Sequence, residues 1–400
     1  MTEHTVLAQV ALGYAPMIDR HKAITALRLT IFPLRPDAAP DAGELLAALA
    51  EVWPEDAGRL SLNVVGETLL KDLLQLQPPR NLMLEVPAFL ASDLALTDAL
   101  TALYQRGNTL LIKGRPLAPL PREVLPCFAY SIIDLADERR DGMPPPGGVS
   151  RTIPHVQAGV STLAQMTEAF GRGAIAVLGW PIEAAADAVR PAPGRGAQPE
   201  MQAIVELINR VDRAEPIDRL EAVMKNDPTM AFKLMRYINS PAFGLSVEVT
   251  SFRHAIMLLG YQRLKKWLAL LLAAGSRDAS MKPVIYAAVR RGLLMEELGR
   301  DSRADDEQRG ELFICGVFSL LDRLMHQPMA ELLKNLPTSE AVRAALVDEA
   351  GPFQPHLALV RAIEASSLID IRDGADAMMM SAGAVNRATL RALVAARQLD

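Results

Sequence analysis

The hydrophobic pattern of this chain changes once, near residue 190, and that change restricts the folds open to it. Up to about residue 180, short apolar runs alternate with longer amphipathic stretches. Beyond residue 199, apolar residues recur at the three-to-four-residue spacing of helices. The pattern therefore predicts an α/β domain followed by an all-α domain.

The first half contains runs with the length of strands, bounded by turn residues. Examples lie at 60–65, 81–86, 109–113, 130–134 and 174–178, with helical patterns at 41–53, 66–76, 92–106 and 160–171. Such alternation favours βαβ units and a mostly parallel sheet or barrel. With seven or eight candidate strands in about 180 residues, we expect a compact TIM-like barrel.

Proline, glycine and alanine are concentrated in residues 190–200, which indicates a linker. We therefore predict domains at 1–189 and 201–400, with a surface loop at 141–150. The helices expected in the second half are 199–213, 216–226, 228–239, 251–274, 281–300, 307–325, 328–335, 338–348, 353–369 and 375–398.

Composition narrows the functional classes. The net charge of -5, with basic and acidic residues mixed, argues against a protein that coats nucleic acid. The two cysteines, Cys127 and Cys315, form no CxxC pair, as is usual in a reducing cytoplasm. No secretory leader is recognisable, and the most apolar run, at 267–275, is too short to span a bilayer. We expect a cytoplasmic protein without a membrane partner.

The helical half lacks a recognisable catalytic motif. None of the six histidines is followed by aspartate or paired with another at helical spacing, so no metal-binding His-Asp dyad is present. The GxSxG, P-loop and HExxH patterns are also absent. This half is expected to hold no metal.

Residues 217–264 resemble the HDOD domain, a bacterial signalling module related in fold to metal-dependent HD phosphohydrolases but without their ligands. The resemblance implies a non-catalytic helical interaction domain. Gly260 is expected to interrupt its helix, and Asp227-Pro228 to begin one. These residues either set the fold or, for some of them, line a partner site. The signature or interaction positions are Asp227, Pro228, Tyr237, Asn239, Ser240, Phe243, His254 and Gly260.

The first half resembles, more weakly, a shortened and degenerate EAL domain, the TIM-barrel-like fold of cyclic-di-GMP phosphodiesterases. The opening at residues 15–20 is similar to EAL domains fused to HDOD domains. Active members hold two divalent cations through carboxylates and an asparagine, since hard cations require several oxygen ligands. Of these positions only Asn63 and Glu85 keep the expected residue type. The others fall at Arg28, Lys113, Gly114, Ile132, Ser161 and Leu178-Gly179.

Two oxygen-bearing side chains are too few for a two-metal centre, and a cation at Arg28 or Lys113 would be repelled. The resemblance therefore implies a non-enzymatic signalling adaptor without a cofactor, which binds other signalling proteins. Whether it forms homo-oligomers stays open. In a second hypothesis Arg28, Lys113 and Arg115 contact the phosphates of cyclic-di-GMP, which binds without hydrolysis. A third is a residual metal-dependent phosphodiesterase.

Overall fold

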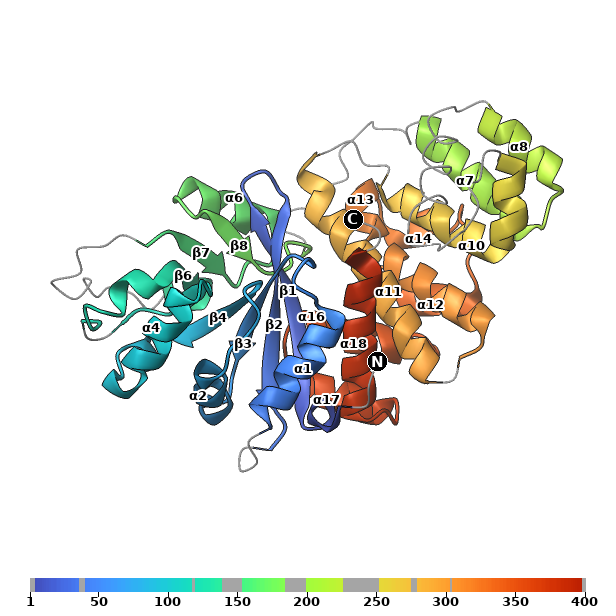
Figure 1. The fold of residues 1–400 in the computed structure, drawn as a ribbon. Helices are drawn as coiled ribbons and strands as arrows, with labels where there is room; N and C mark the ends of the chain where they lie inside the picture. The colour runs from blue at the N-terminus through green and yellow to red at the C-terminus, as the bar shows by residue number, and fades with distance from the viewer. Residues whose placement is uncertain are drawn as a thin grey trace. The chain divides into compact units, whose positions relative to one another are not determined.

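The computed structural model divides the chain into two compact units. The barrel unit comprises residues 1–185 and 361–387, and the helical unit comprises residues 186–360 and 388–400. The ribbon of both units is drawn in Figure 1. The structure describes residues 4–35, 40–116, 119–138, 153–183, 199–225, 252–274, 279–302 and 304–397.

Eight strands close into a barrel in the order of the sequence, from β1 to β8. Strand β1 runs antiparallel to both of its neighbours, and the remaining neighbours pair in parallel. The TIM-like α/β barrel predicted for the first half is confirmed. The strands are β1 (Val10–Asp19), β2 (Ile24–Pro33), β3 (Arg59–Val64), β4 (Leu82–Pro87), β5 (Leu110–Lys113), β6 (Phe128–Asp134), β7 (His155–Ala158) and β8 (Ala176–Leu178).

Amphipathic helices pack on the outside of the barrel (Figure 1). Local capping fixes where two of them begin: Asp41 accepts a hydrogen bond from the Glu44 amide, and Thr162 forms a capping box with Gln165. The α-helices described in the first 183 residues are α1 (Ala42–Val52), α2 (Glu67–Gln75), α3 (Ala88–Ala91), α4 (Thr97–Gln105), α5 (Leu135–Glu138) and α6 (Leu163–Gly171).

One side of β1 is covered by residues from near the end of the chain. Asn386 is buried, and its side-chain oxygen accepts a hydrogen bond from the Leu12 amide at 3.1 Å. Its side-chain nitrogen donates to the carbonyls of Leu7 and Val10, both at 2.7 Å. All of its polar side-chain atoms thus bind backbone groups at the start of the chain, more than 370 residues away in sequence.

Close packing reinforces this contact at Gly13, in the middle of β1. A Cβ atom added to Gly13 would lie 2.5 Å from the hydroxyl of Ser366, so only glycine leaves room for this approach. Residues 361–387 therefore belong to the barrel unit, although their hydrophobic period matches that of the helical half. A local pattern predicts a helix but does not say which core that helix covers.

The helical unit carries the long α-helices of the second half, as the pattern predicted. Helix α17 lies within the barrel unit, and α16 and α18 each contribute residues to both units. The α-helices described after residue 198 are α7 (Pro199–Asp212), α8 (Ile217–Lys225), α10 (Phe252–Ala274), α11 (Lys282–Asp301), α12 (Asp306–Phe318), α13 (Leu321–Met325), α14 (Met329–Leu332), α15 (Glu340–Val347), α16 (Gln354–Glu364), α17 (Leu368–Ala377) and α18 (Ala382–Arg397).

The predicted helix limits are wrong at three places near the end of the chain. The helix expected at 307–325 is interrupted between α12 and α13, and those expected at 353–369 and 375–398 are rearranged into α16, α17 and α18. Ser366 and Met379 adopt left-handed backbone angles, with φ of 51° and 53°. These angles separate α16 from α17 and α17 from α18 at residues that are not typical helix terminators.

Gly260 interrupts α10 as the sequence predicted. Its φ and ψ of 68° and 169° lie in a region that side-chain-bearing residues avoid, and the helix continues on both sides of the kink. Ile256 and Leu259, just before the kink, are buried, whereas Met257 and Leu258 are exposed. The kink thus follows directly after an amphipathic segment.

Some expected features lie outside the described residues. These are the loop at 141–150, most of the linker at 190–200 and the helix at 228–239. Among the helices that the structure does describe, none combines the length and apolar character that a bilayer crossing requires.

Replacing Asn386 with alanine should destabilise the protein by about 2–4 kcal/mol, because the amide of Leu12 and two buried carbonyls lose their partner. Urea denaturation followed by circular dichroism measures the change. Asn335→Ala is the control, since that side chain is exposed, and it should change the free energy of unfolding by less than about 0.5 kcal/mol. Equal effects of the two substitutions would contradict the role given to Asn386.

Gly260→Ala should cost about 1–3 kcal/mol, because alanine is strained at a positive φ with extended ψ. Gly310→Ala is the matched control: Gly310 lies within α12, and an added Cβ would meet only ordinary contacts at 3.6 Å or more. Because alanine favours helix, this control should be neutral or stabilising. Thermal unfolding of both variants tests the difference in sign.

Candidate functional site

The interior of the barrel has an apolar part and a polar part. The apolar part is a cluster from β1, β2 and β4–β8: Met17, Ala26, Met83, Leu111, Ile132, Val156, Ala158, Ala176 and Leu178. Side chains two residues apart on a strand share a face. Continuing by two residues from Ala26, Met83 and Leu111 leads to Arg28, Glu85 and Lys113.

Six side chains on four neighbouring strands form what we call the barrel-mouth network. They lie toward the carboxyl ends of the parallel strands, where ligand sites of such barrels are found. The network consists of Arg28 and Thr30 on β2, Ser61 and Asn63 on β3, Glu85 on β4 and Lys113 on β5.

Glu85 is the central group of the network, with no exposed side-chain surface. Arg28 Nη2 donates to Glu85 Oε2 at 2.6 Å, and Ser61 Oγ donates to Glu85 Oε1 at 2.9 Å. A carboxylate is costly to bury unless it is paired and hydrogen-bonded. Both of its oxygens therefore already have a donor within the protein.

Asn63 is held in a similar way. Lys113 Nζ donates to Asn63 Oδ1 at 2.7 Å, and Asn63 Nδ2 donates to the Thr30 hydroxyl at 3.3 Å. The register pairs Thr30 with Asn63 directly, which explains how two small polar residues on neighbouring strands meet. The oxygen that would ligate a cation is occupied by an ammonium group instead.

The electrostatics of the network centre on Lys113. Burial lowers the pKa of the Lys113 ammonium below its usual value, the Glu85 carboxylate opposes this shift, and Arg28 adds to it. Two basic groups thus share one buried carboxylate. This surplus of basic groups disfavours a divalent cation at the same place.

One donor of the network has no partner among the described residues: Arg28 Nε, which is buried. The Arg28 side chain as a whole is 17% exposed, although Nε itself is not. Arg28 could therefore donate to an anion while it keeps its ion pair with Glu85.

The remaining EAL-like positions do not join this network. Ile132 and Leu178 belong to the apolar cluster. Ser161 follows β7, and its hydroxyl donates to Glu183 at 2.7 Å. Arg115 is exposed and lies two residues beyond β5. The geometry thus unites Arg28, Asn63, Glu85 and Lys113, and it places Arg115 at the rim.

Thr30 and Ser61 were not singled out from the sequence, although they complete the hydrogen bonding of Asn63 and Glu85. A signal was present, because each lies two residues from a selected position on the same strand. The partner of Ser61 comes from another strand, so its role follows only from the barrel register.

Of the HDOD positions, His254 and Gly260 are described, and both lie in α10. His254 is half-buried. The other signature positions lie outside the described residues: Asp227, Pro228, Tyr237, Asn239, Ser240 and Phe243. In the described part of the chain, no group of three or more histidine, cysteine, aspartate and glutamate side chains is arranged to hold a metal ion.

Comparison with known families and proteins adds the following. Residues 199–342 match the HDOD domain, so the helical half carries this domain as expected. An uncharacterised protein of Bacillus subtilis, YuxH, is 29% identical over 169 residues, which make up 40% of each chain. The cyclic di-GMP phosphodiesterase CdgJ of Vibrio cholerae is 27% identical over 172 residues, 42% of this chain and 39% of CdgJ. The aligned part thus spans about two fifths of each relative.

Solved structures similar to this chain include proteins with EAL domains. The EAL enzyme Bd1971 in its cAMP-bound form matches 43% of this chain and 61% of its own, with 13% identity and a TM-score of 0.33. Klebsiella pneumoniae BlrP1 with calcium and cy-diGMP matches 46% of this chain and 57% of its own, with 17% identity and a TM-score of 0.32.

Replacing Glu85 with glutamine should destabilise the protein by about 2–4 kcal/mol, because Arg28 then lies half-buried without its counter-charge. Glu55→Gln, at an exposed carboxylate, is the control and should have little effect. The double variant Arg28→Met/Glu85→Met should lose less than the sum of its single substitutions, since both charges leave together. Additive losses in urea denaturation would contradict direct pairing.

Proposed function

We propose that this protein is a signalling adaptor in a cyclic-di-GMP-related pathway, in which the EAL-like barrel does not hydrolyse the nucleotide and the HDOD domain binds other proteins. Three considerations support this proposal. Within the barrel-mouth network, protein side chains already donate hydrogen bonds to Glu85 and Asn63. Residues 199–342 match the HDOD domain, and a relative is a cyclic di-GMP phosphodiesterase.

The observation that carries the proposal is the internal bonding of Glu85 and Asn63. A metal ion at this site would have to displace Arg28 and Ser61 from the carboxylate, and Lys113 from the amide oxygen. It would also have to lie beside two basic side chains. Two-metal hydrolysis requires several free oxygen ligands that hold the cations about 4 Å apart.

A second candidate function is a receptor that binds cyclic-di-GMP without cleavage. The buried, unpartnered Nε of Arg28 favours it, together with the surplus of basic groups at the barrel mouth. Phosphate oxygens are good acceptors for such donors. In this case the ligand would bind directly to the protein, without a bridging metal.

The test combines hydrolysis and binding measurements on the full chain. We expect no conversion of cyclic-di-GMP in the presence of Mg²⁺ or Mn²⁺, as measured by chromatography of the nucleotide. We also expect no saturable heat in calorimetric titration up to roughly 100 μM ligand, a concentration that detects dissociation constants in the micromolar range.

Two outcomes would change the assignment. Metal-dependent hydrolysis that Asn63→Ala abolishes would overturn the proposal in favour of a phosphodiesterase. Saturable binding of intact nucleotide that Lys113→Gln weakens, while the exposed control Arg59→Gln does not, would instead establish the receptor.

A further inference from the structure

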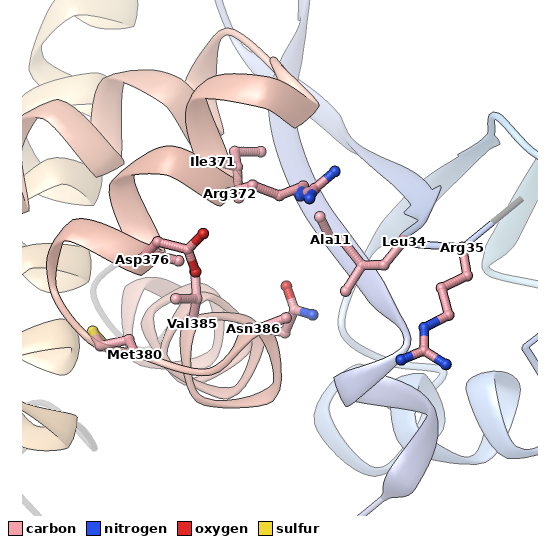
Figure 2. Close-up of a pocket in the computed structure, with 11 residues that line it drawn as sticks. Ala11, Leu34, Arg35, Ile371, Arg372, Asp376, Met380, Val385 and Asn386 are labelled. Carbon is pink, nitrogen blue, oxygen red and sulfur yellow. The ribbon is translucent and has the colours of Figure 1, made fainter.

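A second candidate ligand site lies within the barrel unit, and no residue of the barrel-mouth network lines it. It is a cavity of about 340 Å³ between the start of β1, the segment after β2, and helices α17 and α18. Figure 2 shows the side chains that line it. Its size falls within the range of small-molecule pockets, roughly 300–1,000 Å³.

The wall of the cavity is mostly apolar. Apolar side chains from β1, from the segment after β2 and from the region of α17 and α18 line it, and they include Ala11, Leu34, Ile371, Ala375, Met380 and Val385. Met380 is the buried member of the adjacent methionines at 378–380, whereas Met379 is 94% exposed. The left-handed turn at Met379 thus directs one methionine into the cavity wall and its neighbour into solvent.

The charged side chains of the cavity are Arg35, Arg372 and Asp376. Arg35 follows β2 and Arg372 belongs to α17, and their guanidinium groups lie on different sides of the cavity rim (Figure 2). Neither arginine forms an ion pair with a residue in the described part of the chain. With Asp376, the three groups carry a net charge of +1, which suits a monoanion better than a dianion.

Asn386 also lines the cavity, but its amide is already used. Its oxygen and nitrogen bind the backbone of Leu7, Val10 and Leu12. Polar recognition of a ligand must therefore come from the arginines at the rim, and the interior offers apolar contact. A ligand that fits both features has a hydrocarbon body and one anionic end.

We propose that this cavity binds a small monoanion with an apolar body, of the chemical class of medium-chain carboxylates. The positive charges of Arg35 and Arg372 attract the carboxylate to the rim, and the hydrocarbon part lies against Ile371, Met380 and Val385. Such a ligand contacts both the strand end and the covering helices, so its binding stabilises residues 361–387 on the barrel.

The experiment measures the binding of labelled octanoate to the full chain by equilibrium dialysis, with octanol as the uncharged competitor. We expect one saturable site, with octanol about tenfold weaker than octanoate. Arg35→Gln and Arg372→Gln should each weaken octanoate binding about threefold to fivefold, as expected for exposed charges, and raised salt should have the same effect.

Two further variants make the test specific. Asp376→Asn should strengthen octanoate binding about twofold to threefold, because it removes a repulsive charge. Arg59→Gln, at the opposite ends of the strands, is the control and should leave binding unchanged. All substituted side chains are exposed, so the variants are expected to fold, and thermal unfolding verifies this.

Three results would overturn the proposal. The first is the absence of saturable octanoate binding to the folded wild-type chain. The second is equal binding of octanoate and octanol, which would define an apolar cavity without selectivity for anions. The third is binding that is unaffected by Arg35→Gln, Arg372→Gln and Asp376→Asn, which would place the ligand elsewhere.

Discussion

The burial of the Glu85 carboxylate is the constraint on which the barrel mouth depends. A carboxylate that has left water must be paired and hydrogen-bonded, and Arg28 and Ser61 meet this need. Once Arg28 lies inside, the nearby ammonium of Lys113 requires an acceptor of its own, and Asn63 supplies it. Four strands are thereby linked by side chains as well as by their backbone.

In the function we propose, the same bonds are the reason that Asn63 and Glu85 bind protein side chains and not a metal ion. An oxygen atom ligates a cation only when its lone pairs are available. Arg28 binds Glu85 and Lys113 binds Asn63, and our proposal takes these basic side chains to replace a cation. This exchange of a cation for a protein side chain is the physical basis of the function we propose.

The barrel unit also depends on the contact between β1 and residues near the end of the chain. One side of β1 packs against residues 361–387, with Asn386 bound to the backbone and Gly13 leaving room for Ser366. In the sequence, the HDOD match at 199–342 thus lies between β8 and the segment that covers β1. A barrel shortened at residue 189 would lack Asn386, the partner of the Leu12 amide and of the Leu7 and Val10 carbonyls.

Local periodicity indicated the alternation of strands and helices and the change from α/β to all-α, and the glycine itself indicated the interruption at residue 260. Periodicity could do so because spacing along the chain reports which side of an element is buried. The tertiary structure alone decided that residues 361–387 join the barrel, that Arg28 and Lys113 engage Glu85 and Asn63, and that a cavity forms beside Asn386. These features depend on residues far apart in sequence, whose pairing is set by the closure and register of the barrel.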